Sequence, residues 1–210
     1  MAFKMGRTIS GYLRDKMLLY ILAIFFIMLG IIAGAVSVSP LISGRQHELI
    51  SYIDSFLNTI VYDDINTFAI ALTTVFNNLR LVFIIWLLGM TVIGIPVIIL
   101  ILFVRGFMLG FTVGFLTLEK SMQGVLISVF SIAPPNFILL PGLIVASVTG
   151  ISFSLLLVKG GFRDKSKSIL SHFFSYSIVM IGIAIVAVIA GIVEAYWSPA
   201  MMKLISVYVN

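Results

Sequence analysis

The sequence predicts an all-α membrane protein, a polytopic bundle of five transmembrane helices with an amphipathic helical outer loop. Of its 210 residues, 61% are hydrophobic and only 10% are charged, whereas a typical soluble domain is about 45–50% apolar and about 25% charged. Apolar runs of about 20 residues, the length that crosses a bilayer, recur along the chain. With a mean hydropathy of +1.21, the chain has too little polar surface to enclose a soluble core.

The apolar runs define the spans. The first run, 18–38, carries no charge and is longer than a signal-peptide core, so a span is favoured over a cleaved signal peptide. The region 81–118 is interrupted by Arg105, and Gly94-Ile95-Pro96 predicts a turn that divides it. The expected spans are about 18–38, 79–93, 96–118, 124–158 with proline breaks, and 169–193.

The charge distribution orients these spans. The N-terminal segment and the loop 159–168 each contain four basic residues and one acid, whereas the loop 39–80 contains two basic residues and four acids. Short cytoplasmic loops collect Lys and Arg, so the first two segments are expected in the cytoplasm. An even number of spans must then separate them, which favours the division of 81–118. The N-terminus is therefore expected inside and the C-terminus outside.

The segment 39–78 is the sizeable part expected outside the membrane. Its apolar residues recur at helical spacing with polar residues between them, which predicts an amphipathic helix before a break at 62–64. The apolar face either packs on the protein's own helices or the outer leaflet, or it binds an extracytoplasmic partner. The residues assigned to this docking surface are Leu49, Ile53, Phe56, Ile60, Asp63 and Asp64.

Small residues recur four positions apart on two predicted spans. This spacing allows transmembrane helices to approach closely. It serves either packing within one chain or self-association into a homo-oligomer. The glycines concerned are Gly30 and Gly34 on the first span, and Gly106, Gly110 and Gly114 on the third.

Arg105 is the notable charge inside the predicted membrane region. An arginine at mid-bilayer costs roughly 2.5–3.5 kcal/mol on insertion scales. Pro134 and Pro135 lack the N–H groups that would bond helical carbonyls four residues earlier, and Asn136 follows them. We therefore hypothesise that Arg105 bonds these freed carbonyls and the Asn136 amide. The alternative is a transport pathway lined by the same groups.

Glu194 ends the last predicted span and precedes a tyrosine and a tryptophan. Both aromatic residues favour the membrane interface. Glu194 is therefore expected at the outer surface, too far along its helix to meet Arg105.

Catalytic groupings are not found in the sequence. It contains no cysteine, no zinc-binding His-Glu-x-x-His and no phosphate-binding Walker loop. His47 and His172 are predicted on opposite sides of the membrane, so they cannot share a metal ion. We expect neither an enzyme nor a cofactor, and we attribute the net charge of +5 to membrane orientation rather than to nucleic-acid binding.

Several motifs together resemble the stage II sporulation protein M family of endospore-forming bacteria. The most specific is the glycine-rich third span, from Gly94-Ile95-Pro96 through Arg105-Gly106 to the run 110–116. The outer loop is only loosely similar, and 159–168 is short for the family. The other motifs are Pro134-Pro135-Asn136 with Pro141, the run 151–155, and Glu194-Ala195-Tyr196 with Ser198-Pro199.

The resemblance implies a role in engulfment during sporulation. It implies a multi-pass anchor in the mother-cell membrane at the septum, which recruits cell-wall hydrolases resembling stage II sporulation proteins D and P. The partners would then be the lipid bilayer and these peptidoglycan-degrading enzymes. The alternative function is a transport component, a permease or channel-like subunit, that uses the broken helices and Arg105.

Overall fold

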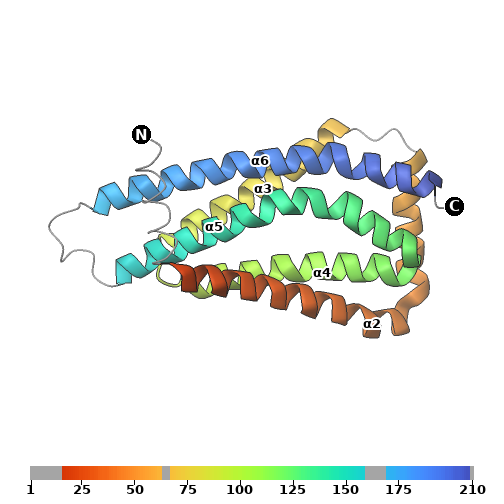
Figure 1. The fold of residues 1–210 in the computed structure, drawn as a ribbon, viewed down its shortest axis with the longest axis horizontal. Helices are drawn as coiled ribbons and strands as arrows, with labels where there is room; N and C mark the ends of the chain where they lie inside the picture. The colour runs from red at the N-terminus through yellow and green to blue at the C-terminus, as the bar shows by residue number, and fades with distance from the viewer. Residues whose placement is uncertain (1–15, 63–66, 159–168, 209–210) are drawn as a thin grey trace.

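The computed structural model describes residues 16–62, 67–158 and 169–208, and all regular structure in these ranges is helical. Figure 1 shows the helices side by side in an elongated bundle. Five segments are long and apolar enough to cross a membrane, which confirms the predicted fold class. The elements are α2 (Met17–Tyr62), α3 (Thr67–Gly89), α4 (Gly94–Ile127), the π-helical η1 (Ser128–Ile132), α5 (Ala133–Val158) and α6 (Ile169–Tyr208).

The second span begins earlier than the sequence indicated. Helix α3 starts at Thr67 rather than near 79, so the segment between the first two spans covers 40–66 and not 39–78. Polar residues at 77, 78 and 80 interrupt the apolar pattern, which concealed the first half of this helix. Arg80, which the sequence analysis counted in the outer loop, therefore lies inside the second span.

The region 81–118 is divided by a short turn, as the charges indicated. Helix α3 ends at Gly89, and α4 begins at Gly94, so the turn lies just ahead of the predicted Gly94-Ile95-Pro96. A side chain at Gly94 would collide with the backbone carbonyl of Leu88. Glycine therefore permits the tight reversal between the two antiparallel helices.

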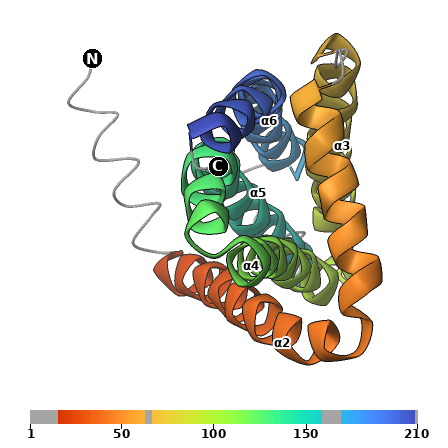
Figure 2. The ribbon, with the colours of Figure 1, turned by 90° about the vertical axis from the view of Figure 1, so that its right-hand side faces the viewer.

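Helix α2 is longer than a span requires. Its 46 residues would extend about 69 Å at 1.5 Å per residue, against about 30 Å of hydrocarbon. In Figure 1 the later part of α2 turns away from the bundle axis, and Figure 2 shows it running across the end of the bundle. This part follows the span Met17–Ser39, and its sequence contains Pro40, which weakens a straight helix. The predicted outer helix is thus a continuation of the first span.

One end of the bundle collects the elements that border the basic segments. Figure 1 places the start of α2, the α3–α4 turn, the end of α5 and the start of α6 together at this end. Residues 1–15 and 159–168, which carry the basic excess, lie outside the described residues. The opposite end is bordered by 40–66, which contains one arginine and four acids.

Helices α2 and α4 pack backbone to backbone through their glycines. A Cβ atom at Gly30 or Gly34 would collide with the carbonyl oxygens of Phe103 or Phe107, and one at Gly110 with that of Ile31. Such close approach allows many van der Waals contacts and Cα–H···O contacts, which hold helices together in lipid. The two sets of glycines therefore face each other within one chain; the remaining members, Gly106 and Gly114, lie against Ile27 and Ala35.

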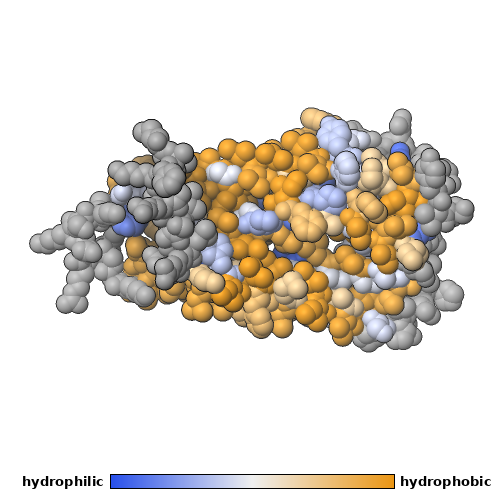
Figure 3. Space-filling view, viewed as in Figure 1, coloured by the Kyte–Doolittle hydropathy of each residue, from blue (hydrophilic) through white to orange (hydrophobic). Residues whose placement is uncertain are grey.

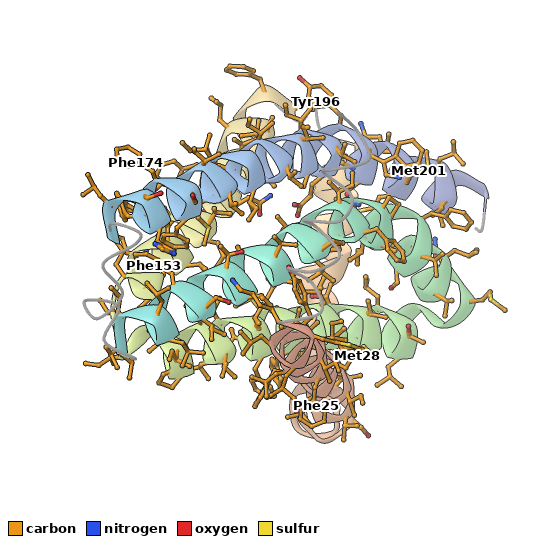
Figure 4. The ribbon with its side chains drawn as sticks, turned by 60° about the vertical axis from the view of Figure 1, so that its left-hand side comes forward. Phe25, Met28, Phe153, Phe174, Tyr196 and Met201 are labelled. Carbon is orange, nitrogen blue, oxygen red and sulfur yellow. The ribbon has the colours of Figure 1, made fainter. Side chains whose placement is uncertain are left out.

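Aliphatic side chains fill the centre of the bundle. Ile85, Ile98, Leu102 and Leu143 are at most 1% exposed. The outward side chains are also hydrophobic, as Figure 3 shows along most of the described surface. Figure 4 shows Phe25 and Met28 pointing away from the bundle, and they are 57% and 52% exposed. This surface suits contact with lipid.

Tyr176 of α6 binds the C-terminal end of α3. Its hydroxyl donates to the carbonyl of Trp86 at 2.9 Å, one of the last carbonyls of α3, which lack helical donors. Its ring stacks on Phe153 with centroids 4.7 Å apart, and Figure 4 shows Phe153 between α5 and α6. Ser154 of α5 donates to the carbonyl of Thr91 at 2.7 Å. The α3–α4 turn is thereby held by both later helices.

We expect Gly110→Ala to destabilise the protein by about 1–3 kcal/mol, because the added methyl group forces α2 and α4 apart. The matched control is Gly182→Ala, since a Cβ atom there meets nothing within 4 Å. Thermal unfolding of the purified protein in detergent measures both. Equal stability of the two variants would show that the close α2–α4 contact does not hold the fold.

Candidate functional site

Side chains of α6 bond two backbone carbonyls of η1, the short element between α4 and α5. Pro134 and Pro135 leave the carbonyls of Phe130 and Ser131 without helical donors. Trp197 Nε1 donates to the Phe130 carbonyl at 2.8 Å, and Ser198 Oγ donates to the Ser131 carbonyl at 2.8 Å. Two consecutive side chains of α6 therefore satisfy two consecutive carbonyls of η1, just before the start of α5.

These contacts correct the hypothesis about Arg105. The donors to the two freed carbonyls are side chains of α6 and not Arg105. Asn136 Nδ2 donates to the carbonyl of Ile132, in the preceding turn, at 2.8 Å. The sequence correctly indicated that Pro134 and Pro135 leave these two carbonyls without helical donors, and we call the two carbonyls the proline gap. Their actual donors were not recognised, because Trp197 was assigned to the membrane interface.

The same contacts fix the position of Glu194, which lies one turn before Trp197 on α6. Glu194 is half-buried and accepts a side-chain hydrogen bond from Asn78 of α3. Asn78 is 3% exposed, and its amide also contacts the carbonyl of Ala187 at 3.5 Å. Arg105 of α4 is half-buried and attracts Glu194 electrostatically. We call Asn78, Arg105 and Glu194 the polar cluster.

The polar cluster corrects the expected position of Glu194. The structure places this residue within electrostatic range of Arg105, inside the span Leu170–Ile205, rather than isolated at the surface. The Nε atom of Arg105 is buried and has no hydrogen-bond partner among the described residues. Opposite charges inside a membrane stabilise each other strongly, because the surroundings screen them little.

Asn78 was missed as a site residue. The buried positions of α3 are Ala71, Asn78, Val82, Ile85 and Gly89, which follow a helical stripe. This stripe could have revealed Asn78, but only with the knowledge that the helix starts at Thr67. The sequence analysis instead placed Asn78 outside the membrane.

The polar cluster links three helices, α3, α4 and α6. The same helices also contribute to the buried hydrophobic core of the bundle. A crevice of about 240 Å³ between α2, α4 and α5 is lined by apolar side chains apart from Ser128 and Asn136. In the described part of the chain, no group of three or more His, Cys, Asp or Glu could hold a metal ion.

The predicted docking surface is only partly described. The backbone of 46–61 is helical within α2 and lies across the end of the bundle (Figure 2). The side chains of Leu49, Ile53, Phe56 and Ile60, and all of Asp63 and Asp64, lie outside the described residues. The assignment of these residues to partner binding therefore stays a prediction.

Comparison with known protein families now adds to this geometry. The family model of stage II sporulation protein M matches residues 23–199, most of the chain. The chain belongs to the stage II sporulation protein M family. Comparisons with curated proteins and with solved structures give no match.

The family match makes this chain a sporulation-related membrane protein. The matched range contains the polar cluster, the α2–α4 glycines and both α6 contacts to the proline gap. The family resemblance recognised in the third span and around the prolines is thereby confirmed. For this family member, the polar cluster and the proline gap are the candidate functional features inside the membrane.

We expect the double substitution Trp197→Phe with Ser198→Ala to destabilise the protein by about 1–3 kcal/mol, because two carbonyls of η1 lose their donors. The control is Tyr196→Phe, since Tyr196 is 56% exposed and points away from α6 in Figure 4. Thermal unfolding in detergent measures the stability of the double variant and of the control. A double variant as stable as the control would contradict the proposed anchoring of α6.

The attraction between Arg105 and Glu194 predicts that substitutions at these two positions have non-additive effects on stability. Either Arg105→Leu or Glu194→Leu alone should destabilise the protein, because the remaining charge in the bundle loses the opposite charge that attracts it. The double variant should recover much of this loss, since neither charge then stays in the bundle. A double-mutant cycle on purified protein measures the coupling. Strictly additive effects would show that the two charges act separately.

Proposed function

We propose that this protein is the membrane anchor of the sporulation engulfment machinery, which recruits peptidoglycan hydrolases and holds them at the septum. The observation that carries the proposal is the family match over residues 23–199. The proposed partners are wall hydrolases resembling stage II sporulation proteins D and P. The anchor supplies position and membrane attachment, and its partners carry out the chemistry.

The architecture supports an anchor in two ways. Its interior is filled by Ile85, Ile98 and Leu143, which suits a solid platform. The later part of α2 crosses the end of the bundle, where it offers a helix parallel to the membrane surface. In the proposed orientation, with the basic segments in the cytoplasm, this helix faces the cell wall. That face is where an enzyme acting on peptidoglycan must be held.

A transport component is the alternative function. Its support is the pair of intramembrane charges, Arg105 and Glu194, because charged residues are costly in lipid and often mark transport pathways. Their attraction to each other and the hydrogen bond from Asn78 offer a structural purpose. The packed aliphatic centre also favours the anchor, because a transported solute needs a path between the helices.

The part of α2 that follows the span Met17–Ser39, which we call the crossing helix, provides the test. We replace residues 46–61 with the same residues in scrambled order, which keeps length and composition but destroys the apolar face. In sporulating cells, the variant should reach the membrane in normal amounts but capture at least about tenfold less wall hydrolase, and engulfment should arrest. Affinity capture with mass spectrometry and membrane staining measure the two effects.

The matched control is Met28→Leu, a conservative change at an exposed position on the membrane-spanning part of α2. It should leave capture and engulfment unchanged. Capture of no wall hydrolase by the natural protein would reject the anchor function. Full capture by the scrambled variant would keep the function but reject the crossing helix as the docking surface.

A further inference from the structure

Helix α3 carries polar side chains on its outward face in the middle of the membrane. Asn77 and Arg80 are both exposed. Arg80 lies nine residues before Gly89, the inner end of the helix, which corresponds to about 14 Å along its axis. The hydrocarbon core is about 30 Å thick, so Arg80 lies near its middle.

An arginine facing lipid at this depth is unfavourable. The cost is roughly 2.5–3.5 kcal/mol, and intramembrane arginines normally face a bundle interior, a water-filled cavity or an opposite charge. A long side chain can extend towards the headgroups, but it covers only part of the distance from the middle of the bilayer. Arg80 and Asn77 therefore mark a face of α3 that needs polar groups from another molecule.

The surroundings of Arg80 form a groove. A crevice of about 510 Å³ runs between α3 and α6, with Arg80 on its wall. Phe76 and Phe83 lie one turn before and one turn after Arg80 on the same face. They are 67% and 54% exposed. On the opposite wall, Ile181 of α6 is 62% exposed, and Ser177 is the polar residue.

We propose that the groove between α3 and α6 is the docking site for one transmembrane helix of a partner protein, which carries an aspartate or glutamate at the depth of Arg80. The carboxylate accepts paired hydrogen bonds from the guanidinium group, a geometry that also gives specificity. The aromatic side chains above and below Arg80 contact apolar residues one turn away on the partner helix. Asn77 adds a second hydrogen-bonding group beside the groove.

Charge complementarity favours this occupant over a second copy of the chain. Among the five described spans, Glu194 is the sole acid, and it is half-buried and bonded by Asn78. A second copy would have to break that bond to neutralise Arg80. The phosphate groups of lipids lie at the membrane surface, far from the middle of α3. The site therefore requires a partner helix that carries an aspartate or glutamate of its own inside the membrane.

The inference stands on the depth and exposure of Arg80 and does not require that the partner be a wall hydrolase. It goes beyond the crossing helix at the outer end, because it assigns a second contact surface inside the membrane. A partner held at both places would bind more tightly than at either alone, since the second contact becomes intramolecular.

The test uses photo-crosslinking in the full-length protein in sporulating cells. A benzophenone derivative of phenylalanine replaces Phe76 in the groove or, as a matched control, Phe25 on the exposed face of α2. The Phe76 probe should give one discrete protein adduct that the Phe25 probe does not give. Mass spectrometry identifies the adduct, and the proposal requires an aspartate or glutamate within its transmembrane helix.

Charge reversal then tests the pairing. Arg80→Glu should reduce the yield of the Phe76 adduct at least about tenfold, and changing the partner's acid to arginine should restore it. Arg80→Leu should also reduce the yield, while the thermal stability of the purified protein stays equal or rises, because the change removes an exposed charge from an apolar surface. That second variant keeps the test informative if Arg80→Glu fails to insert.

Three outcomes overturn the inference: an adduct with a second copy of the chain, adducts with lipid alone, or an adduct unaffected by either change at Arg80. Recovery of an acidic membrane partner unrelated to wall hydrolysis would uphold the groove and count against the proposed anchor function. The two proposals therefore fail on different results.

Discussion

The carbonyls of Phe130 and Ser131 place a constraint on the whole bundle, because a backbone acceptor freed inside a membrane needs a donor from the protein. Trp197 and Ser198 of α6 meet this need at 2.8 Å each. Because these side chains have a fixed length, the two bonds set the position of α6 along η1. Glu194, one turn earlier on α6, is thereby brought to the level of Asn78 on α3. The bonds to the proline gap thus help to bring Glu194 within electrostatic range of Arg105.

The α2–α4 contact has a different physical basis. Between helices in lipid there is no hydrophobic driving force, so close backbone approach supplies the attraction. Gly30 and Gly34 on one helix and Gly106 and Gly110 on the other are buried in this contact. These glycines pack against a neighbouring helix of the same chain, so they do not form a free face for self-association. The contacts proposed with partners therefore involve other surfaces of the molecule.

The structure offers two such surfaces at different depths. The later part of α2 crosses the end of the bundle, and the groove beside Arg80 opens between α3 and α6. Two surfaces on one bundle agree with the anchor function proposed above. The polar cluster of Asn78, Arg105 and Glu194 contributes by joining α3, α4 and α6, so that both surfaces belong to one platform.

The sequence alone determined the fold class, because 61% hydrophobic residues leave no other solvent than the bilayer. It also located the proline gap and the glycines, since Pro and Gly act through their own backbone. Only the tertiary structure decided which donors close the gap, that Glu194 approaches Arg105, and that Arg80 lies within a span. Hydrogen bonds and charge pairs between helices depend on how far one helix is shifted along another. That relative shift is decided by packing contacts between residues far apart in the chain, such as Ser131 and Ser198.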